Sequence, residues 1–510
     1  MEKYYEPEDI RQADLIAAEK CGIATSVLME NAGTNAARAI MKILPAASKF
    51  LILAGHGNNG GDGFVAARVL VKADKDVFVL KTAADRDYKG DALRNLRALR
   101  ELASEKCSII ESGEILEDDI AAFIDDADCV VDALLGTGTT GAPRGEVARL
   151  IGLCSSGSGK IISLDIPSGI DPKKGGAYEP CVRALATVTF LAPKAGMSAY
   201  PAREMCGRIV TVGIGADPTV VLKDAAPYVC YDQSDLKDML PRRGRDIHKG
   251  DRGGVLIFGG SENYRGAPLL TALGALRAGA GLVVMAVPDY MVEGASVMLP
   301  EAVFAPIPTV NGEIAAESLN DVISPWSSRC RAAVFGPGVG RRESVSDAEK
   351  WFLGNWHAPL LIDADGLYFL GRHKTDFARR NDLVVTPHAG EAATLLETQA
   401  AAVVSDRKAS VLALNEIAGI ALLKGSGTLV SDSFEIRKIL AGSPALAVPG
   451  SGDVLSGAIG AFLAGGLSVF DAATAGALVH AAAGSAIEEK RGVNGILARE
   501  IADEISTLVG

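Results

Sequence analysis

The stretch FLILAGHGNNGGDGFVAARVLV, residues 50–71, decides the fold of the first half of the chain. Its opening run, Phe50–Ala54, is apolar at every position, which predicts a strand buried on both faces, and Phe64–Val71 has the spacing of a helix. Between them, Gly55–Gly63 is rich in glycine, so its backbone amides and the following helix N-terminus can face an anion. The stretch therefore predicts a strand, a ligand-binding loop and a helix of an α/β sheet.

The same alternation continues outward in both directions. In the first half we expect further buried strands at residues 76–80, 128–136, 160–169 and 186–194. In the second half we expect strands at residues 255–261, 282–287, 332–338, 359–366, 383–391 and 421–432, and late helices at 454–464 and 472–488. Apolar runs separated by helices predict mostly parallel sheets covered on both faces, in layered α/β domains. We expect a Rossmann-like three-layer domain over 1–217, a linker over 218–244 and a second α/β domain over 245–510.

Composition narrows the class of protein. A length of 510 residues favours two or three domains, and a net charge of -12 disfavours a protein that grips nucleic-acid phosphates. The eight cysteines are scattered without metal-ligand or disulfide spacing, which fits a reducing cytoplasm. Because neither a leader pattern nor a run of about 18 apolar residues is present, we expect no targeting and no membrane segment.

The glycine loop does not fit a common dehydrogenase. Gly55–Gly60 matches the G-x-G-x-x-G fingerprint, but the next strand ends in Lys81 and Thr82 where a ribose-binding acid is required. Three adjacent strand ends instead present Asn59, Asp132 and Ser168, oxygen donors of the kind that hard cations prefer. Asp165 would face the same crevice and is the best acid–base candidate.

Three motifs in this order, NNGGDG, VVDALLGTG and LDIPSG, resemble the NAD(P)H-hydrate epimerases. The resemblance implies interconversion of the two epimers at the hydroxyl-bearing carbon of the hydrated nicotinamide ring. It implies a potassium ion on Asn59, Asp132 and Ser168. The residues that it implies for binding the hydrated cofactor are Asn58, Asn59, Gly60, Gly61, Asp62, Gly136, Thr137, Gly138, Thr139, Thr140, Gly141, Ala142 and Asp165.

The second half carries a different glycine motif, Pro449-Gly450-Ser451-Gly452-Asp453, directly before a helix. Glycine amides at a helix N-terminus can stabilise charge on a phosphate, and the carboxylate can take a proton from a hydroxyl. Upstream, Lys424–Thr428 lies between two expected strands, where its lysine can meet phosphate as a point charge. Both loops would serve one nucleotide.

These loops resemble the ribokinase-like superfamily, in which the aspartate of G-x-G-D is the catalytic base. Together with TPHAGE (386–391), HKG (248–250), GGS (259–261), RAGAGL (277–282) and GPGVG (336–340), they resemble the NAD(P)H-hydrate dehydratases. The resemblance implies contacts of the hydrated cofactor with Ala267, Gly338, His388 and Asp453. It implies contacts of the adenine nucleotide with Lys424, Gly425, Ser426, Gly427, Thr428 and Gly452.

The implied dehydratase mechanism is phosphorylation of the ring hydroxyl, with Asp453 as base, followed by loss of phosphate. Bacterial-type fusions of the two domains resemble ADP users assisted by magnesium, releasing AMP and phosphate, although the residues themselves leave ADP and ATP open. Relatives often read GGTGD where this chain has PGSGD, and Pro449 removes an amide donor, a departure that bears on nucleotide affinity.

One substrate would join the two halves, because the dehydratase uses the S form of the hydrate and the epimerase recycles the R form. An alternative is a kinase for a small hydroxylated vitamin precursor with a regulatory first domain. Another is a first half that acts as a binding module for RNA or a protein. For the leading hypothesis we expect small-molecule partners (hydrated NADH, hydrated NADPH and ADP), no nucleic acid or membrane, and a homo-oligomer; preference between NADH and NADPH stays open.

Overall fold

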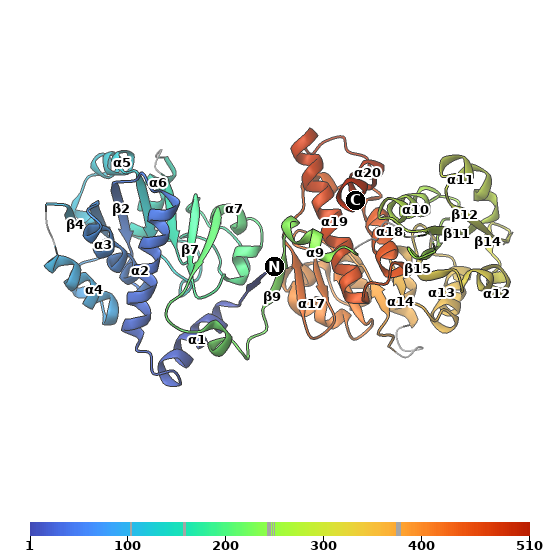
Figure 1. Ribbon diagram of the computed structural model, residues 1–510, viewed down its shortest axis with the longest axis horizontal. Helices are drawn as coiled ribbons and strands as arrows, with labels where there is room; N and C mark the ends of the chain where they lie inside the picture. The colour runs from blue at the N-terminus through green and yellow to red at the C-terminus, as the bar shows by residue number, and fades with distance from the viewer. Residues whose placement is uncertain (103–104, 157–159, 242–245, 247, 249, 374–378) are drawn as a thin grey trace. The chain divides into compact units, whose positions relative to one another are not determined.

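The computed structural model describes residues 1–510 except 103–104, 157–159, 242–245, 247, 249 and 374–378 (Figure 1). Its contacts divide the chain into an N-terminal unit, Lys3–Tyr228, and a C-terminal unit, Val229–Gly510 with Met1–Glu2. Lys249 of the HKG motif and residues 242–245, where the expected linker meets the second domain, lie outside the described residues. No helix in the described part of the chain is both long and apolar enough to cross a membrane.

The N-terminal unit is built on a parallel sheet. Among its described residues the strand order is β4-β3-β2-β5-β6-β7-β8, and each neighbouring pair is parallel. The strands are β2 (Lys49–Ala54), β3 (Asp76–Lys81), β4 (Cys107–Glu111), β5 (Cys129–Ala133), β6 (Ile161–Leu164), β7 (Ala186–Phe190) and β8 (Arg208–Val212). The order reverses between β2 and β5. The loops after these two strands therefore diverge, which is where ligands bind in open α/β sheets.

Helices cover both faces of this sheet, as the double-sided apolar run Phe50–Ala54 predicts. Phe50 and Ile52 pack in the cluster that includes the helices α1 to α4, whereas Leu51 and Leu53 pack with α5 and α6 on the other face. The α/β class expected from the sequence is confirmed. The helices of this unit are α1 (Pro7–Glu19), α2 (Thr25–Ile43), α3 (Asn58–Lys72), α4 (Gly90–Glu101), α5 (Glu117–Asp126), α6 (Gly145–Ser156), α7 (Ala202–Cys206) and α8 (Pro218–Val221).

The glycine stretch is more helical than its composition predicts. Helix α3 begins at Asn58 rather than at Phe64, so most of the expected loop forms its first turns. Packing explains the glycines: a Cβ on Gly60 would lie 1.8 Å from the Gly55 carbonyl oxygen, and one on Gly63 would lie 2.8 Å from the Ala133 Cβ. These glycines let the helix approach the strand ends despite their low helix propensity.

The C-terminal unit contains a larger, mixed sheet. Within the described residues its order is β1-β9-β20-β19-β18-β17-β16-β15-β10-β11-β12. The pairings from β12 to β18 are parallel, and those of β19 with β18 and β20 are antiparallel. The strands are β1 (Glu2–Tyr4), β9 (Tyr228–Tyr231), β10 (Gly254–Phe258), β11 (Leu282–Pro288), β12 (Val303–Ile307), β15 (Cys330–Phe335), β16 (Leu360–Ile362), β17 (Leu383–Val385), β18 (Ile420–Leu423), β19 (Leu429–Ser431) and β20 (Ile436–Ile439), with a separate hairpin of β13 (Thr309–Val310) and β14 (Glu313–Ile314).

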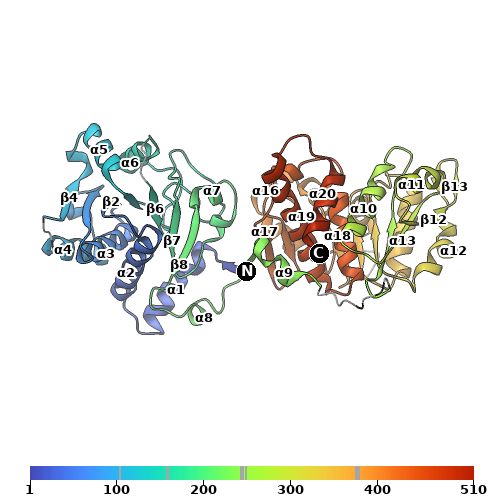
Figure 2. The same ribbon diagram turned by 45° about the horizontal axis from the view of Figure 1, so that its top comes forward.

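A second reversal of strand order lies in this sheet. From β10 the chain first builds β11 and β12 on one side, and then returns to place β15 on the other side. Helices α10, α18, α19 and α20 pack together on one face (Figure 2). On the other face, Phe258 stacks on Phe335, and Phe352 packs against both rings at an angle. The helices are α9 (Leu236–Met239), α10 (Gly266–Arg277), α11 (Val292–Met298), α12 (Leu319–Ile323), α13 (Glu343–Asn355), α14 (Asp365–His373), α15 (Ala389–Leu395), α16 (Ala400–Ser405), α17 (Arg407–Leu414), α18 (Ser451–Ala464), α19 (Val469–Arg491) and α20 (Ala498–Leu508).

Two further differences from the expected elements concern segment 218–244 and the start of α18. The segment contains α8, β9 and α9. Strand β9 lies between β1 and β20 in the large sheet, and its residues Val229, Cys230 and Tyr231 are buried. Helix α18 begins at Ser451 rather than Val454. Asp453 therefore stands in the first turn of the helix and not before it.

Candidate functional site

In the N-terminal unit, Asp132 organises the crevice beside the reversal point. Its carboxylate accepts hydrogen bonds from Ser163 Oγ (2.8 Å), the Leu134 amide (3.2 Å), and both the hydroxyl (2.6 Å) and amide (2.8 Å) of Ser168. Burial raises the pKa of Asp132, against the lowering effect of these hydrogen bonds. The expected grouping of Asp132 and Ser168 at neighbouring strand ends is present, and the carboxylate fixes the Ser168 loop.

Asn59 lies in the first turn of α3, in the same crevice. Its amide nitrogen donates to the carbonyls of Leu135 (2.9 Å) and Leu164 (3.2 Å), which ties α3 to the ends of β5 and β6. Its oxygen Oδ1 is buried and has no hydrogen-bond partner within the described residues. A buried amide oxygen without a partner is costly unless a bound group satisfies it.

Asp165 follows β6 in a left-handed conformation, with φ 64°, and is held by two groups. Its Oδ2 accepts the Thr137 amide at 3.2 Å, and its Oδ1 pairs with the ammonium of Lys194. Lys194 is completely buried and also donates to Thr189 Oγ1 (2.8 Å) and the Phe190 carbonyl (3.1 Å). A Cβ on Gly136 would lie 3.3 Å from both the Asn59 Cβ and Asp165 Oδ2, so the three expected motifs meet here.

The charges of Asp165 and Lys194 also affect the pKa values of two further carboxyl groups, those of Asp62 and Asp14. Burial, followed by the negative charges of Asp165 and Asp14, raises the pKa of Asp62 well above its usual value. Burial and the Asp165 charge raise the pKa of Asp14, in α1, to about 6, against the effect of Lys194. The crevice therefore holds two carboxyl groups whose pKa values are raised by burial and by neighbouring charge, an arrangement suited to proton transfer. Asp14 and Lys194 were not among the residues expected from the sequence.

In the C-terminal unit, Asp453 is the residue expected from the sequence to act as the base. Burial and the negative charge of Asp363 raise its pKa to about 7, against the effect of Lys424. Within the described residues it has no hydrogen bond or ion pair. The turn before it is anchored from α19, because His480 Nε2 lies 3.0 Å from both the hydroxyl and the carbonyl oxygen of Ser451. Burial lowers the pKa of His480 to about 4, so it is a neutral donor to that carbonyl.

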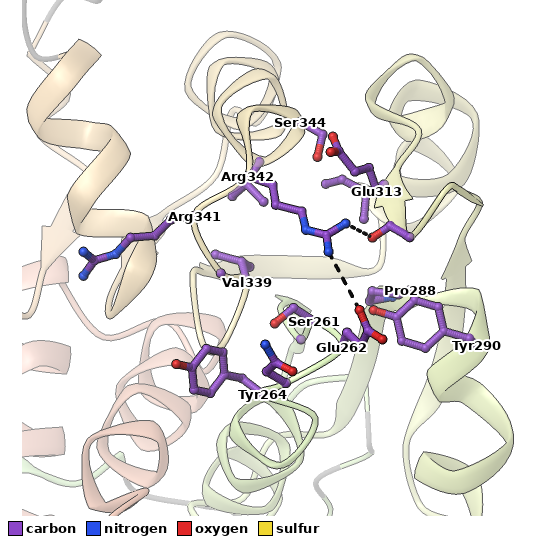
Figure 3. Close-up of a pocket in the computed structure, with 16 residues that line it drawn as sticks. Ser261, Glu262, Tyr264, Pro288, Tyr290, Glu313, Val339, Arg341, Arg342 and Ser344 are labelled. Carbon is purple, nitrogen blue, oxygen red and sulfur yellow. Dashed lines mark hydrogen bonds and ion pairs between the residues drawn. The ribbon is translucent and has the colours of Figure 1, made fainter.

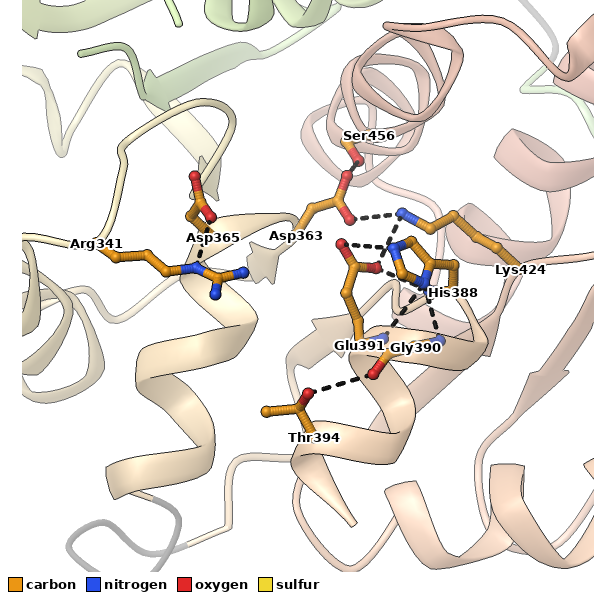
Figure 4. Close-up of polar contacts among 9 residues, drawn as sticks. All are labelled: Arg341, Asp363, Asp365, His388, Gly390, Glu391, Thr394, Lys424 and Ser456. Atoms are coloured by element: carbon orange, nitrogen blue, oxygen red, sulfur yellow. Dashed lines mark hydrogen bonds and ion pairs between the residues drawn. The ribbon is translucent and has the colours of Figure 1, made fainter. Parts of the chain in front are cut away.

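Lys424, expected to meet a nucleotide phosphate, is bound to carboxylates (Figure 4). Its ammonium lies 2.8 Å from Asp363 Oδ1 and 3.7 Å from Glu391 Oε2. The other oxygen of Asp363 accepts the Ser456 hydroxyl at 2.6 Å, which links β16, β18 and α18. Burial raises the pKa of Asp363, but the positive charge and hydrogen bond of Lys424 together have the larger effect, so the pKa of Asp363 lies below its usual value. A Cβ on Gly452 would lie 3.5 Å from Lys424 Nζ, so the two expected nucleotide loops are adjacent.

The loop Lys424–Thr428 is shaped by its glycines and by one arginine. Gly425 and Gly427 have φ values of 144° and 65°, which side chains disfavour. Arg407 donates to the carbonyls of Lys424 (3.3 Å) and Gly427 (3.3 Å) from below the loop. The backbone is thereby held in a fixed curve next to the Lys424 ammonium.

His388 caps helix α15. Its Nδ1 accepts the amides of Gly390 (3.0 Å) and Glu391 (3.3 Å), and Glu391 accepts the His388 amide in return at 2.8 Å (Figure 4). These bonds leave Nε2 as the protonated nitrogen. The side chain is 60% exposed, so it is accessible to a ligand at the end of β17.

The other expected substrate residues, Ala267 and Gly338, lie together at the β10–β15 reversal. A Cβ on Gly338 would lie 3.0 Å from the Ala267 Cβ, and Ser261 Oγ donates to the Gly338 carbonyl at 2.8 Å. The missed residues of this unit are Asp363 and His480. A charged residue directly after a buried strand, as Asp363 follows β16, is a pattern that could have identified the first. Nothing local marks the second.

Two family models match the chain. The model described as NAD(P)H-hydrate dehydratase matches residues 255–507, and the one described as YjeF-related protein N-terminus matches residues 25–196. The second covers Asn59, Asp132 and Asp165, and the first covers Gly338, Lys424 and Asp453.

Relatives match along nearly the whole chain. The bifunctional NAD(P)H-hydrate repair enzyme Nnr of Thermanaerovibrio acidaminovorans is 39% identical over 510 residues, covering 99% of this chain and 98% of the relative. The enzyme of the same name from Escherichia coli is 34% identical over 505 residues, covering 98% and 93%. A solved structure of the ADP/ATP-dependent NAD(P)H-hydrate dehydratase from Bacillus subtilis is 23% identical, with a TM-score of 0.46 over 55% of this chain and 97% of that chain. On the family matches in both units and the relatives over 30% identical, the chain belongs to the family of bifunctional NAD(P)H-hydrate repair enzymes.

Proposed function

We propose that the C-terminal unit dehydrates the S form of hydrated NADH and NADPH, and that the N-terminal unit interconverts the R and S forms. The observation that carries the dehydratase proposal is Asp453, in the first turn of α18 beside Lys424. A carboxyl group with a pKa of about 7 is matched to general-base work near neutral pH. Asp453 would take the proton of the ring hydroxyl while that oxygen attacks the terminal phosphate of ADP, releasing AMP.

The second step regenerates the reduced nicotinamide. The bond between the ring carbon and the phosphorylated oxygen breaks, a proton leaves the neighbouring carbon, and the double bond of the dihydropyridine forms. Phosphate is a good leaving group, whereas hydroxide is a poor one. The net reaction converts the hydrate and ADP to NAD(P)H, AMP and phosphate.

Residues on the β18 side would hold the nucleotide. Lys424 supplies a positive charge for its phosphates, and the amides of Gly425–Thr428 and Gly452 supply donors. Magnesium prefers carboxylate and phosphate oxygens, and Glu391 is the candidate protein ligand because its carboxylate lies 3.7 Å from the Lys424 ammonium, beside the proposed phosphate site. When bound, the ion would neutralise charge on the phosphates.

In the N-terminal unit, Asp165 is the proposed acid–base residue of epimerisation. It would take the proton of the ring hydroxyl as the bond from that carbon to the ring nitrogen opens, forming an aldehyde. Burial raises the pKa of the neighbouring Asp62 carboxyl, which makes Asp62 the candidate to supply the proton that the nitrogen needs. Closure on the opposite face of the aldehyde returns both protons and gives the other epimer.

The residues of the crevice fit a potassium ion. Asn59 Oδ1 is a buried oxygen without a partner in the described residues, and Asp132 holds Ser168 beside it, so Asn59, Asp132 and Ser168 would form the site. When bound, the ion would supply a positive charge next to the substrate. Within the described residues no group of three His, Cys, Asp or Glu side chains suits a transition metal.

One assay tests both activities. Purified protein is incubated with hydrated NADH of both epimers, ADP, magnesium and potassium, and the absorbance of NADH is followed. Recovery from both epimers supports the proposal. Recovery from one epimer alone would contradict the epimerase activity, and no recovery would contradict both. ATP in place of ADP measures the nucleotide preference.

The vitamin-kinase alternative would instead phosphorylate a hydroxylated precursor and leave hydrated NADH unchanged. Family membership disfavours it, as it disfavours a binding module in the first half. A homo-oligomer in the cytoplasm remains a prediction, testable by light scattering and by localisation of the tagged protein.

A further inference from the structure

A pocket in the C-terminal unit lies where the strand order reverses, between the loops that follow β10 and β15 (Figure 3). The loop after β10 contributes Ser261 to Tyr264, the loop after β15 contributes Val339 to Arg342, and the first turn of α13 contributes Ser344. Tyr290, after β11, and the β13–β14 hairpin close the remaining sides. Reversal points at the carboxyl ends of parallel strands are the usual ligand sites of such sheets.

The pocket adjoins the residues expected to contact the hydrated ring. Val339 and Gly340 directly follow Gly338, and Ser261 of the pocket donates to the Gly338 carbonyl at 2.8 Å. A Cβ on Gly338 would lie 2.6 Å from the Tyr264 carbonyl oxygen. A ligand bound at Ala267 and Gly338 would therefore extend into this pocket.

The turn that carries Asp453 lies between this region and the nucleotide loop. On one side, a Cβ on Gly450 would meet Leu270 of α10 at 2.3 Å, and Ala267 is in the first turn of α10. On the other side, a Cβ on Gly452 would lie 3.5 Å from Lys424 Nζ. The phosphate donor and the hydrate would approach Asp453 from opposite sides, and the pocket belongs to the side of the hydrate.

The lining suits a phosphorylated nucleoside. Arg342 spans the pocket, with Nη1 donating to the Gly312 carbonyl at 2.9 Å and Nη2 3.8 Å from Glu262 Oε2 (Figure 3). The ion pair is long and both partners are about half exposed or more, at 48% and 67%, so a phosphate can displace Glu262 at little cost. The Ser344 hydroxyl is buried without a partner in the described residues.

Two tyrosines give the pocket aromatic surface. Tyr264 is 58% exposed and Tyr290 is 38% exposed, although both are large and partly apolar. Arg265 lies over the ring of Tyr290, 5.4 Å from its centre. An exposed aromatic ring can stack on a nucleic-acid base.

We infer that this pocket binds the adenosine-phosphate end of the hydrated dinucleotide, with Arg342 contacting its phosphate groups and Tyr290 contacting the adenine. The inference rests on the proposed dehydratase function. It makes Arg342 a binding residue of the substrate that acts far from the reacting carbon.

A shortened substrate tests the inference. Hydrated reduced nicotinamide mononucleotide has the reacting ring but no adenosine end. Arg342→Ala is expected to raise the KM for the hydrated dinucleotide roughly 10- to 100-fold, as loss of charged hydrogen bonds does. The kcat, and the KM for the mononucleotide, should stay within about 2-fold because the ring contacts are unchanged.

Arg341→Ala is the matched control. Arg341 borders the pocket by its backbone, but its guanidinium points away and donates to Asp365 at 3.2 Å (Figure 3). The Arg341→Ala variant removes the same charge one residue away, and it should leave the ratio of the KM for the dinucleotide to the KM for the mononucleotide unchanged. Equal KM increases for both substrates in Arg342→Ala, an unchanged KM for the dinucleotide, or the same ratio change in Arg341→Ala would each overturn the inference.

A second measurement does not depend on turnover. Crystals of the full chain soaked with NADPH should show adenosine density in this pocket, and crystals of Arg342→Ala should lose it. Adenosine bound elsewhere on the C-terminal unit, or no adenosine there, would overturn the inference. If the pocket is filled but neither hydrate is turned over, the proposed dehydratase reaction fails and the pocket assignment stands.

Discussion

The two units place an aspartate at the same kind of position, beside a reversal of strand order, but surround it differently. Asp165 pairs directly with the buried ammonium of Lys194 and accepts the Thr137 amide. Asp453 has no hydrogen bond within the described residues, because Lys424 binds Asp363 instead. The comparison shows that the position of the nearest lysine matters. A carboxylate that pairs with the lysine is held in place, whereas one whose nearest lysine pairs with another carboxylate can exchange a proton near pH 7.

Removing Asp453, the proposed proton acceptor of the C-terminal unit, should have the largest effect. Asp453→Asn is expected to lower kcat of dehydration by about 10²- to 10⁴-fold, because the amide cannot take the hydroxyl proton. Epimerisation, followed by separating the two hydrates chromatographically, should be unchanged. Loss of both activities in a folded variant would contradict two independent sites.

Breaking the lysine pair of the N-terminal unit should act on stability and activity together. Lys194→Met leaves Asp165 buried without its counter-charge, a change that costs about 3–5 kcal/mol in the free energy of unfolding. Epimerisation should be lost while dehydration remains. Lys49→Ala, which removes an exposed pair with Asp126 in the same unit, is the control, and urea unfolding should show a much smaller loss of stability for it. Similar costs for both variants would contradict the assigned role of burial.

The glycines that open α3 and α18 should also respond differently. Gly60→Ala places a Cβ 1.8 Å from a carbonyl oxygen and is expected to destabilise the N-terminal unit by about 1–3 kcal/mol. Gly452→Ala meets only the end of Lys424, at 3.5 Å, and should weaken ADP binding with little change in stability. Thermal unfolding measures the stability of both variants, and ADP titration measures their nucleotide affinity. If Gly452→Ala lost as much stability as Gly60→Ala, the expected difference between the two glycines would be contradicted.

The pH dependence should report the environment of Asp453. Because its base form is active and its pKa is about 7, kcat/KM on the S hydrate should fall about tenfold per pH unit below 7 and level off above. The folded pKa is raised above the usual 3.8, so the folded state holds the extra proton between these values. The stability from this group is complete below pH 4 and is lost as pH rises through 7.

Replacing Asp453 should also have a smaller effect, on stability, and in the opposite direction to its effect on activity. At pH 8 the Asp453→Asn protein should unfold with a free energy roughly 2–4 kcal/mol higher than the wild type, since it buries no charge there. At pH 4 the difference should vanish. Urea unfolding at both pH values measures it, and equal stability at pH 8 would show that Asp453 is solvated.

The sequence was sufficient for the layers and for part of each site. Apolar runs such as Phe50–Ala54 predict buried strands, and parallel strands bring their carboxyl ends together, which is why Asn59, Asp132 and Asp165 could be grouped in advance. The family resemblance drawn from these motifs is confirmed by the matches over residues 25–196 and 255–507.

What the sequence did not predict depends on contacts between distant segments. Lys194 reaches Asp165 from beyond β7, and Asp14 comes from α1, so no local spacing links them. The early starts of α3 and α18 were not predicted because glycine has a low helix propensity. In the folded chain, Gly60 packs so closely on the Gly55 carbonyl that only a residue without a side chain fits there. Segment 218–244 was taken for a linker because its polar residues outweigh the buried run of β9.

The Lys424–Asp363 pair beside Asp453 makes nucleotide binding and proton uptake linked equilibria. Phosphates arriving at Lys424 change the charge that Asp453 senses, and by reciprocity the protonation of Asp453 changes the nucleotide affinity by the same factor. The number of protons exchanged is then a property of the complex. Calorimetry of ADP binding in buffers with different heats of ionisation would count them, and near neutral pH the apparent affinity of the enzyme for its phosphate donor would vary with the acidity of the cell.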